Sequence, residues 1–163
     1  SLLSYNKALE LVKAHSKEFE SEIINMDESL NKVISEDIFS PIDSPAFERS
    51  AMDGYAIQAK DTFSISEGSH VTLKIIDSIT AGRVSDKEVF AGAAIEIMTG
   101  AMMPLGADSV VMQEFTEREN DEVRIYKKVF PYLHVSRKGE DRREGDLIRK
   151  KGTIISAIVK FVF

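Results

Sequence analysis

The chain has 163 residues, of which 43% are hydrophobic and 8% aromatic, so it can bury a core and we expect an ordered globular protein. It has no cysteine and three histidines, which excludes disulfides, thiolate metal sites and cysteine nucleophiles and leaves few ligands for structural zinc. A net charge of −6 argues against general affinity for nucleic acid, and the lack of both a signal-peptide pattern and an apolar run near roughly 20 residues predicts a cytoplasmic protein without membrane contacts.

Two helices are predicted near the N-terminus. Ser4 can cap the first, because apolar residues recur at helical spacing over 5–13. After a short strand or extended piece at 21–26, Asp27 can cap a second helix that ends near Glu36. The apolar stripe of this second helix consists of Leu30, Val33 and Ile34.

A connector follows, with Ser-Pro pairs at Pro41 and Pro45, because a residue before proline is pushed toward extended geometry. From 55 to 132 the hydrophobic period changes to the alternation of strands, for example over 71–75 and 122–125. Glycine and proline turns divide this segment into short strands, which predicts a small barrel or sandwich. We therefore place a domain boundary at the connector.

The last part, 134–163, is divided by glycines into brief extended pieces. Its ending, 154–163, carries more large apolar groups in a row than a terminus left in water. We expect this ending to pack on another surface or to continue.

The segment ERSAMDGYAI, residues 48–57, places Asp53 directly before Gly54. Glycine permits positive φ and close approach of a ligand or of another backbone. The same pair is a common turn signal, so a tight turn at the entry of a strand is the alternative. The hydroxyls of Ser50 and Tyr55 beside the carboxylate favour a functional site.

A second segment, 95–114, joins an alternating strand to a loop of small residues, Thr99, Gly100 and Ala101. The backbone N–H groups of such a loop and the Thr99 hydroxyl can receive an anion. The alternative is a hairpin whose small residues serve packing, and periodicity does not separate the two.

A third segment, RKGEDRREGD at 137–146, mixes basic and acidic side chains and is typical of a solvated, charge-balanced loop. As a site, it can supply an arginine for phosphate or oxyanion recognition and a carboxylate for Mg²⁺. The three histidines lie far apart, and no Walker-type loop, dinucleotide glycine fingerprint or nucleophile elbow occurs. The common nucleotide-binding and hydrolase folds therefore lose their main support.

Taken in order, PAFERSAMDGYAI, ITAG, IMTGAMMPLGADSVVMQE and RKGEDRREGD closely resemble the molybdopterin molybdenumtransferase family, which includes MoeA and the gephyrin E-domain. The resemblance corresponds to the N-terminal portion of a longer, multidomain chain. It implies an α+β fold: a mixed α/β domain formed by both chain ends, 1–45 and 134–163, with a β-rich, barrel-like domain, 46–133, inserted between them. The change of period at the two connectors agrees with this division.

The resemblance also implies a reaction, in which adenylylated molybdopterin and molybdate become molybdenum cofactor and AMP. Mg²⁺ is the implied cofactor, because hard carboxylate oxygens hold this ion and it neutralises charge on the phosphoanhydride. The implied site lies in a cleft of an elongated homodimer. An enzyme that adenylylates molybdopterin is the implied further partner.

Site residues carry over from the motifs. The implied catalytic residues are Asp53, Thr99 and Asp141. The implied substrate contacts are Ser50, Tyr55, Gly100, Ala101 and Arg137. The implied metal ligands are Asp53, Glu140 and Asp141. Glu114 is a further candidate, which a surface role at a strand end would explain equally.

Two positions depart from the family pattern, since Ser136 stands where a basic residue is common and Ala93 where an acidic one is common. In the family that the sequence resembles, a third domain supplies most of the pterin and molybdate pocket, and the resemblance covers neither this domain nor the fourth. We therefore expect the N-terminal fragment of the enzyme, inactive by itself. The alternatives are a dimeric scaffold or binding module of the gephyrin type and a small Mg²⁺-dependent hydrolase complete in itself.

Overall fold

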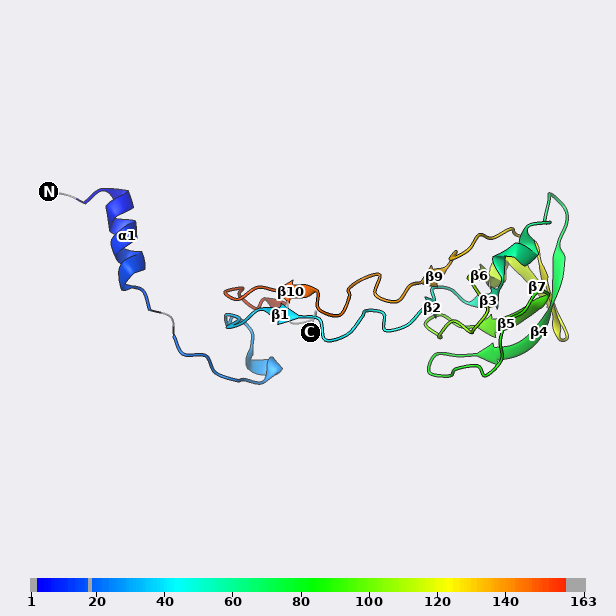
Figure 1. Cartoon of the computed structure of the whole chain (residues 1–163), viewed down its shortest axis with the longest axis horizontal. Helices are drawn as coiled ribbons and strands as arrows, with labels where there is room; N and C mark the ends of the chain where they lie inside the picture. Colours follow the sequence, from blue (N-terminus) through cyan, green and yellow to red (C-terminus); the bar gives the residue numbers. More distant parts are fainter. Residues whose placement is uncertain (1–2, 18, 158–163) are drawn as a thin grey trace. The chain divides into compact units, whose positions relative to one another are not determined.

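Two compact units make up the computed structural model, which describes residues 3–17 and 19–157. The first unit runs to Ile38 and resumes at Ile148, and the second is Phe39–Leu147. The fold is of mixed α and β content and strands dominate it (Figure 1). The predicted domain boundaries, 45/46 and 133/134, differ from the boundaries of these compact units. The predicted division into domains stays a prediction. Residues 158–163, for which packing of the apolar ending was predicted, lie outside the described residues.

The first predicted helix is confirmed as α1, Tyr5–His15. The Ser4 side chain accepts a hydrogen bond from the Lys7 N–H at 3.4 Å, so Ser4 is the N-cap. None of the residues of α1 is buried, and its Val12 side chain is 66% exposed. Across the two described ranges, the structure has no helix long and apolar enough to cross a membrane.

The second predicted helix is wrong. Asp27 lies in a three-residue 3₁₀ helix, η1 (Met26–Glu28), and no helix follows it in this segment. The backbone beyond η1 pairs with a distant segment instead, since the Ile34 N–H donates to the Thr153 carbonyl at 2.9 Å and Val33 forms an antiparallel bridge with Ile154. Pairing across the fold thus outweighs the helical spacing of the apolar residues. The extended piece predicted at 21–26 forms no strand.

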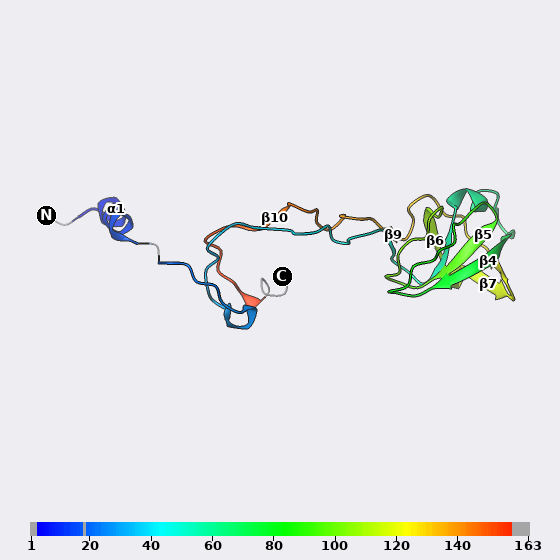
Figure 2. The same cartoon turned by 60° about the horizontal axis from the view of Figure 1, so that its bottom comes forward.

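The second unit contains a six-stranded sheet that curls into a half-barrel (Figures 1 and 2). Its strands are β3 (Gly54–Ile57), β4 (Val71–Ile79), β5 (Ala93–Ile97), β6 (Ser109–Met112), β7 (Thr116–Glu119) and β8 (Glu122–Ile125). Their order is β6-β3-β5-β4-β8-β7, and the β4–β5 pair is parallel while the other neighbours are antiparallel. The prediction of short strands curled like a barrel is confirmed in this form.

Smaller elements complete the two units. Two further two-stranded sheets pair β1 (Ile38–Phe39) with β10 (Leu147–Arg149) and β2 (Arg49–Ser50) with β9 (Val135–Ser136). The short 3₁₀ helices of the second unit are η2 (Ala59–Thr62) and η3 (Gln113–Phe115).

The core lies on both faces of the sheet. Along β3, Tyr55 and Ile57 pack in one buried cluster while Ala56 packs in the other, as the alternation of a strand requires. The same alternation places Leu73 of β4 and Val123 of β8 in the first cluster, on the face that the sequence predicts. Along β3 no polar side chain is exposed, so the polar groups of the predicted site lie in the loops that flank this strand.

Gly54 at the start of β3 is required by a close approach of two backbones. A Cβ atom at this position would lie 1.8 Å from the carbonyl oxygen of Val111 in β6. Of the two roles that the sequence allows for this glycine, close approach is the one that applies, because Gly54 does not have a positive φ. The direction of the chain at Asp53 is thereby set by β6.

We expect Gly54→Ala to lower the free energy of unfolding of this unit by more than about 3 kcal/mol, at the upper end for point substitutions, because the methyl group overlaps backbone that has no room to move. Gly82→Ala is the control: Gly82 has a φ of +85° and no atom within 4 Å of an added Cβ, so only the left-handed backbone is penalised, by about 1 kcal/mol. Urea denaturation followed through NMR signals of residues 39–147 measures both. Equal losses for the two variants would contradict the account of Gly54.

Candidate functional site

The structure brings two predicted site residues, Asp53 and Thr99, into direct contact. Oδ1 of Asp53 accepts hydrogen bonds from the Thr99 N–H and the Thr99 hydroxyl, each at 2.7 Å. Asp53 immediately precedes β3 and Thr99 closely follows β5, and these strands are neighbours, with Gly54 opposite Ile97. Residues 46 apart in the sequence thus meet because of the strand order.

The contact fixes the charge of Asp53. The Thr99 backbone N–H and then its hydroxyl lower the pKa of the Asp53 carboxyl, because both donors stabilise the ionised form. At neutral pH the group is therefore an anion and a weak proton acceptor, suited to receiving donors or a cation. Within the described residues Oδ2 makes no hydrogen bond or ion pair, so this oxygen is available to a ligand.

Ser50, Gly100 and Ala101 hold the same two loops together. The Gly100 N–H donates to the Ser50 carbonyl at 2.8 Å, the Ser50 N–H donates to the Ala101 carbonyl at 2.9 Å, and the Ala101 N–H donates to Met98 at 3.0 Å. The Ser50 side chain is 1% exposed and donates to the Met52 carbonyl at 2.5 Å. The backbone donors that the sequence offers to an anion are thus used inside the protein, and any substrate contact by these residues stays a prediction.

The alternative of a hairpin around Thr99 is wrong. Strands β5 and β6, which flank the loop, are not neighbours, because β3 lies between them. The loop crosses over the end of β3 and contacts the segment that precedes it. The small residues therefore serve contact between two loops rather than a tight reversal.

Tyr55 lies in the core. Its side chain is 5% exposed, and on β3 it stands opposite Glu96 of β5, which pairs with Arg118 at 2.9 Å. Burial, and then the charge of Glu96, raise the pKa of the Tyr55 phenol, so it is neutral at physiological pH. The sequence places its hydroxyl beside Asp53, but side chains alternate along a strand and Tyr55 joins the packed cluster. A substrate contact by Tyr55 stays a prediction.

The charged segment at 137–146 forms a loop after β9. Glu140 accepts hydrogen bonds from the Ser136 hydroxyl and from the Arg137 N–H, the latter at 2.8 Å. These donors, the hydroxyl first, lower the pKa of the Glu140 carboxyl. The Arg137 guanidinium lies over the ring of Tyr132, 4.0 Å from its centroid. Asp141 is exposed, and its N–H donates to the Ser44 carbonyl at 3.0 Å.

A short ladder links this loop to the segment that leads to Asp53. Strands β2 and β9 pair with Ser50 opposite Val135 and Arg49 opposite Ser136 (Figure 1). Both candidate loops are therefore attached to one pair of strands of the second unit. No contact joins the carboxylates of Asp53 and Asp141 among the described residues.

The three carboxylates predicted as metal ligands do not form a cluster. No group of three or more His, Asp or Glu residues that could hold a metal ion occurs in the described ranges. Both oxygens of Glu140 already accept hydrogen bonds, and Oδ1 of Asp53 is engaged by Thr99. The residues present do not fit a Mg²⁺ site held by this chain alone. Glu114 lies exposed in η3.

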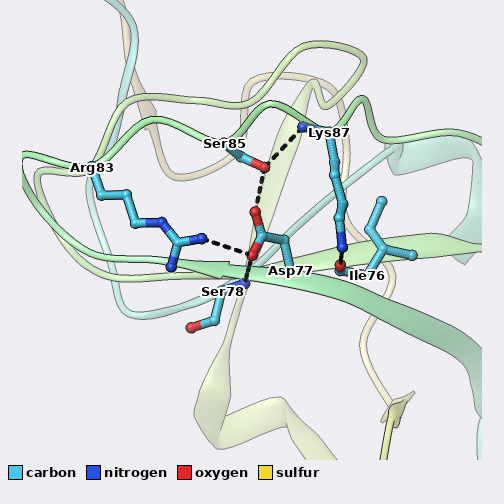
Figure 3. A network of polar contacts seen from close by, with 6 residues as sticks. All are labelled: Ile76, Asp77, Ser78, Arg83, Ser85 and Lys87. Carbon is cyan, nitrogen blue, oxygen red and sulfur yellow. Dashed lines mark hydrogen bonds and ion pairs between the residues drawn. The ribbon is translucent and has the colours of Figure 1, made fainter.

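A polar network outside the predicted site residues surrounds Asp77 of β4 (Figure 3). Its carboxylate accepts from the Ser85 hydroxyl at 2.6 Å, from the Ser78 N–H at 2.9 Å and from Arg83 at 3.3 Å. The Ser85 hydroxyl, before the Ser78 N–H, lowers the pKa of Asp77. Lys87 donates to the carbonyl of Ile76, where the register between β4 and β5 shifts. The network orders the loop after β4.

A hollow lies beside this network. Its volume is about 480 Å³ and it is open to solvent. It is lined by Lys74, Ile75, Ile76, Lys87, Glu88 and Phe90, and it contains none of the predicted site residues.

We expect Thr99→Val to raise the pKa of Asp53 part of the way to its ordinary value, because valine lacks the hydroxyl and keeps the N–H donor. A group with a lowered folded pKa stabilises the fold above the unfolded pKa of about 4, and this contribution disappears as pH falls through the lowered value. The variant should therefore lose less stability on acidification than the parent. NMR titration of the Asp53 carboxyl carbon measures the shift.

Thr72→Val, at an exposed site on β4, is the matched control and should leave the Asp53 titration unchanged. An unchanged pKa of Asp53 in Thr99→Val would contradict the assignment of the hydroxyl as a donor to this carboxylate.

Comparisons with known proteins cover nearly the whole chain. The family model described as "MoeA N-terminal region (domain I and II)" matches residues 3–160. A putative molybdopterin biosynthesis protein of Methanocaldococcus jannaschii is 41% identical over 152 residues, which cover 93% of this chain and 35% of that protein. A molybdopterin molybdenumtransferase of Staphylococcus epidermidis is 37% identical over 156 residues, covering 95% of this chain and 37% of the relative.

Solved structures agree. The crystal structure of the molybdopterin biosynthesis MoeA protein from Pyrococcus horikoshii OT3 matches with a TM-score of 0.92 at 37% identity, over 99% of this chain and 43% of that one. The chain spans about a third of the length of the curated relatives it matches. Because the family model covers nearly all residues and the identities exceed a third over most of the chain, the chain belongs to the MoeA family, of which it carries the N-terminal region.

Proposed function

We propose that this chain acts in molybdenum cofactor biosynthesis, as the N-terminal part of a molybdopterin molybdenumtransferase. The reaction converts adenylylated molybdopterin and molybdate into molybdenum cofactor and AMP. The observation that carries the proposal is the contact between Asp53 and Thr99 in a chain of this family. This contact brings two of the family's sequence motifs together in one exposed polar site.

In this proposal Asp53 binds and orients substrate. A carboxylate held ionised by two donors repels anions such as molybdate, so it is suited to the N–H groups of a pterin or the hydroxyls of a nucleotide. Its free Oδ2 accepts such a donor while Oδ1 stays fixed by Thr99. Rigid placement of one acceptor lowers the entropic cost of orienting the substrate.

The loop that carries Glu140 and Asp141 supplies the second contact. Arg137 is a permanent cation beside it and is exposed, so it can pair with the phosphate of the adenylyl group. Asp141 is exposed and carries a carboxylate without a recorded partner among the described residues, which leaves it available to the substrate. Glu140 is engaged within the loop and acts by holding its shape.

The proposed site is composite. The chain covers about a third of its relatives, and its described residues provide two polar loops. We propose that the remaining contacts come from the rest of such an enzyme and from a second copy in a homodimer, and that this chain by itself is inactive. The substrate would come from an enzyme that adenylylates molybdopterin, and the protein would work in the cytoplasm.

We expect Asp53→Asn in the full-length protein to lower the rate of molybdenum cofactor formation at least about tenfold, because the amide removes the anionic acceptor. Asparagine keeps an oxygen for the two Thr99 donors, so thermal stability and oligomeric state should change little. The measurement is conversion of adenylylated molybdopterin and molybdate, followed by release of AMP. Thr99→Val should show a smaller loss, since it loosens Asp53 without removing the charge.

The matched control is Asp61→Asn. Asp61 also accepts a backbone N–H, that of Gly92 at 3.0 Å, and has no proposed role in the site. It should leave AMP release unchanged. If Asp53→Asn, Thr99→Val and Asp61→Asn are all as active as the parent, the enzymatic proposal fails and the scaffold alternative is favoured. Loss of folding in Asp53→Asn would assign Asp53 to the turn instead.

A further inference from the structure

The loop that presents Asp141 has no apolar side chain with which to pack. Residues 136–146 read SRKGEDRREGD, and all of these are polar, charged or glycine. The hydrophobic effect therefore contributes almost nothing to its order. Another interaction must hold it in one conformation if it is to place a functional carboxylate.

Asp43, which lies between the two prolines of the connector, contacts both ends of this loop. Its Oδ1 accepts a hydrogen bond from the Glu144 N–H at 2.9 Å, and its Oδ2 pairs with the Lys138 ammonium at 3.3 Å. The Asp43 side chain is 23% exposed, so this ion pair is better shielded than a fully exposed one. The Glu144 N–H, before Lys138, lowers the pKa of the Asp43 carboxyl, which keeps it charged at neutral pH.

Backbone hydrogen bonds from the adjoining residues complete the clamp. The Asp141 N–H donates to the Ser44 carbonyl at 3.0 Å, and the Ser44 N–H donates to the Arg142 carbonyl at 2.7 Å. The Gly139 N–H donates to the Pro45 carbonyl at 2.9 Å. Asp141 thus stands at the middle of a loop that is held on both sides by residues 43–45.

Gly139 is packed against the same carboxylate. It is buried with a φ of +69°, and an added Cβ would lie 3.3 Å from Oδ1 of Asp43. The turn at Gly139 and the position of Asp43 therefore depend on each other. Removing the carboxylate removes an acceptor and also the surface on which the turn packs.

We infer that Asp43 is a positioning residue, which holds the 138–144 loop so that Asp141 faces the substrate of the composite site. This inference rests on the proposed function. Asp43 has no proposed contact with the substrate and acts through the loop, so its loss should disturb the placement of Asp141 while leaving the other site residues, Asp53 and Thr99, in contact.

The first test is amide hydrogen exchange in the full-length protein. Asp43→Ala should accelerate exchange at the Glu144 N–H about tenfold or more, because a hydrogen bond to a charged acceptor is lost. Asp43→Asn keeps an oxygen for this donor and should stay within about threefold of the parent. Asp77→Ala is the matched control, since it removes a similar carboxylate clamp from the loop at 83–87 (Figure 3) and should leave Glu144 unaffected.

The second test is the kinetics of AMP release by the same proteins. Asp43→Ala should lower kcat about tenfold and change KM by less than about threefold, because misplacement of a group in the site slows the reaction. Asp43→Asn should recover most of kcat, and Asp77→Ala should leave it unchanged. If Asp43→Ala fails to fold, Asp43→Asn decides: a modest rise in exchange with a modest fall in kcat supports the inference.

Three outcomes would overturn the inference. They are unchanged exchange at Glu144 in Asp43→Ala, a loosened loop with unchanged kcat, and an equal fall of kcat in Asp43→Ala and Asp77→Ala. Asp53→Asn, measured in parallel, distinguishes a failure of the positioning role of Asp43 from a failure of the proposed function. If it is impaired while Asp43→Ala is not, only the positioning role is lost. If both are fully active, the proposed function itself is wrong.

Discussion

The close approach of Gly54 to the Val111 carbonyl is the constraint on which the candidate site depends. It lets β3 lie directly beside β6 at the point where β3 begins, while β5 pairs with its other edge. Asp53 is then one residue from a fixed backbone, and Thr99 is two residues beyond the end of β5. Their contact follows from strand order, and neither loop could provide it alone.

Exposed loops in this protein are ordered by carboxylates. Four carboxylates each accept a backbone N–H and a side-chain donor. They are Asp43, Asp53, Asp77 and Glu140. Their pKa values are all lowered, since each donor stabilises the ionised form. In the loop at 136–146, which has no apolar side chain, directional contacts to charge replace packing. The same device serves a loop with a proposed role and the loop after β4, which has none.

Prediction from the sequence succeeded for elements whose structure is set by neighbouring residues in the chain. The Ser4 cap with its helical spacing gave α1, and the alternation over 71–75 and 122–125 gave strands with the buried face as expected. It failed where distant segments compete for the same backbone groups. The apolar spacing after Asp27 is helical, but Ile34 bonds to Thr153, which no local pattern announces. Likewise, the loop around Thr99 has the composition of a hairpin, and only the insertion of β3 between β5 and β6 excludes it.

For the candidate site too, some features follow from the sequence and others only from the tertiary structure. The sequence by itself determined the family, through four ordered motifs, and the resemblance predicted Asp53 and Thr99 as site residues. The tertiary structure alone decided that these two residues touch, that Tyr55 is buried, that the N–H groups of Gly100 and Ala101 are already used, and that Asp43 holds the charged loop. Residue type is a property of one position, whereas a hydrogen bond depends on which segments the sheet brings side by side.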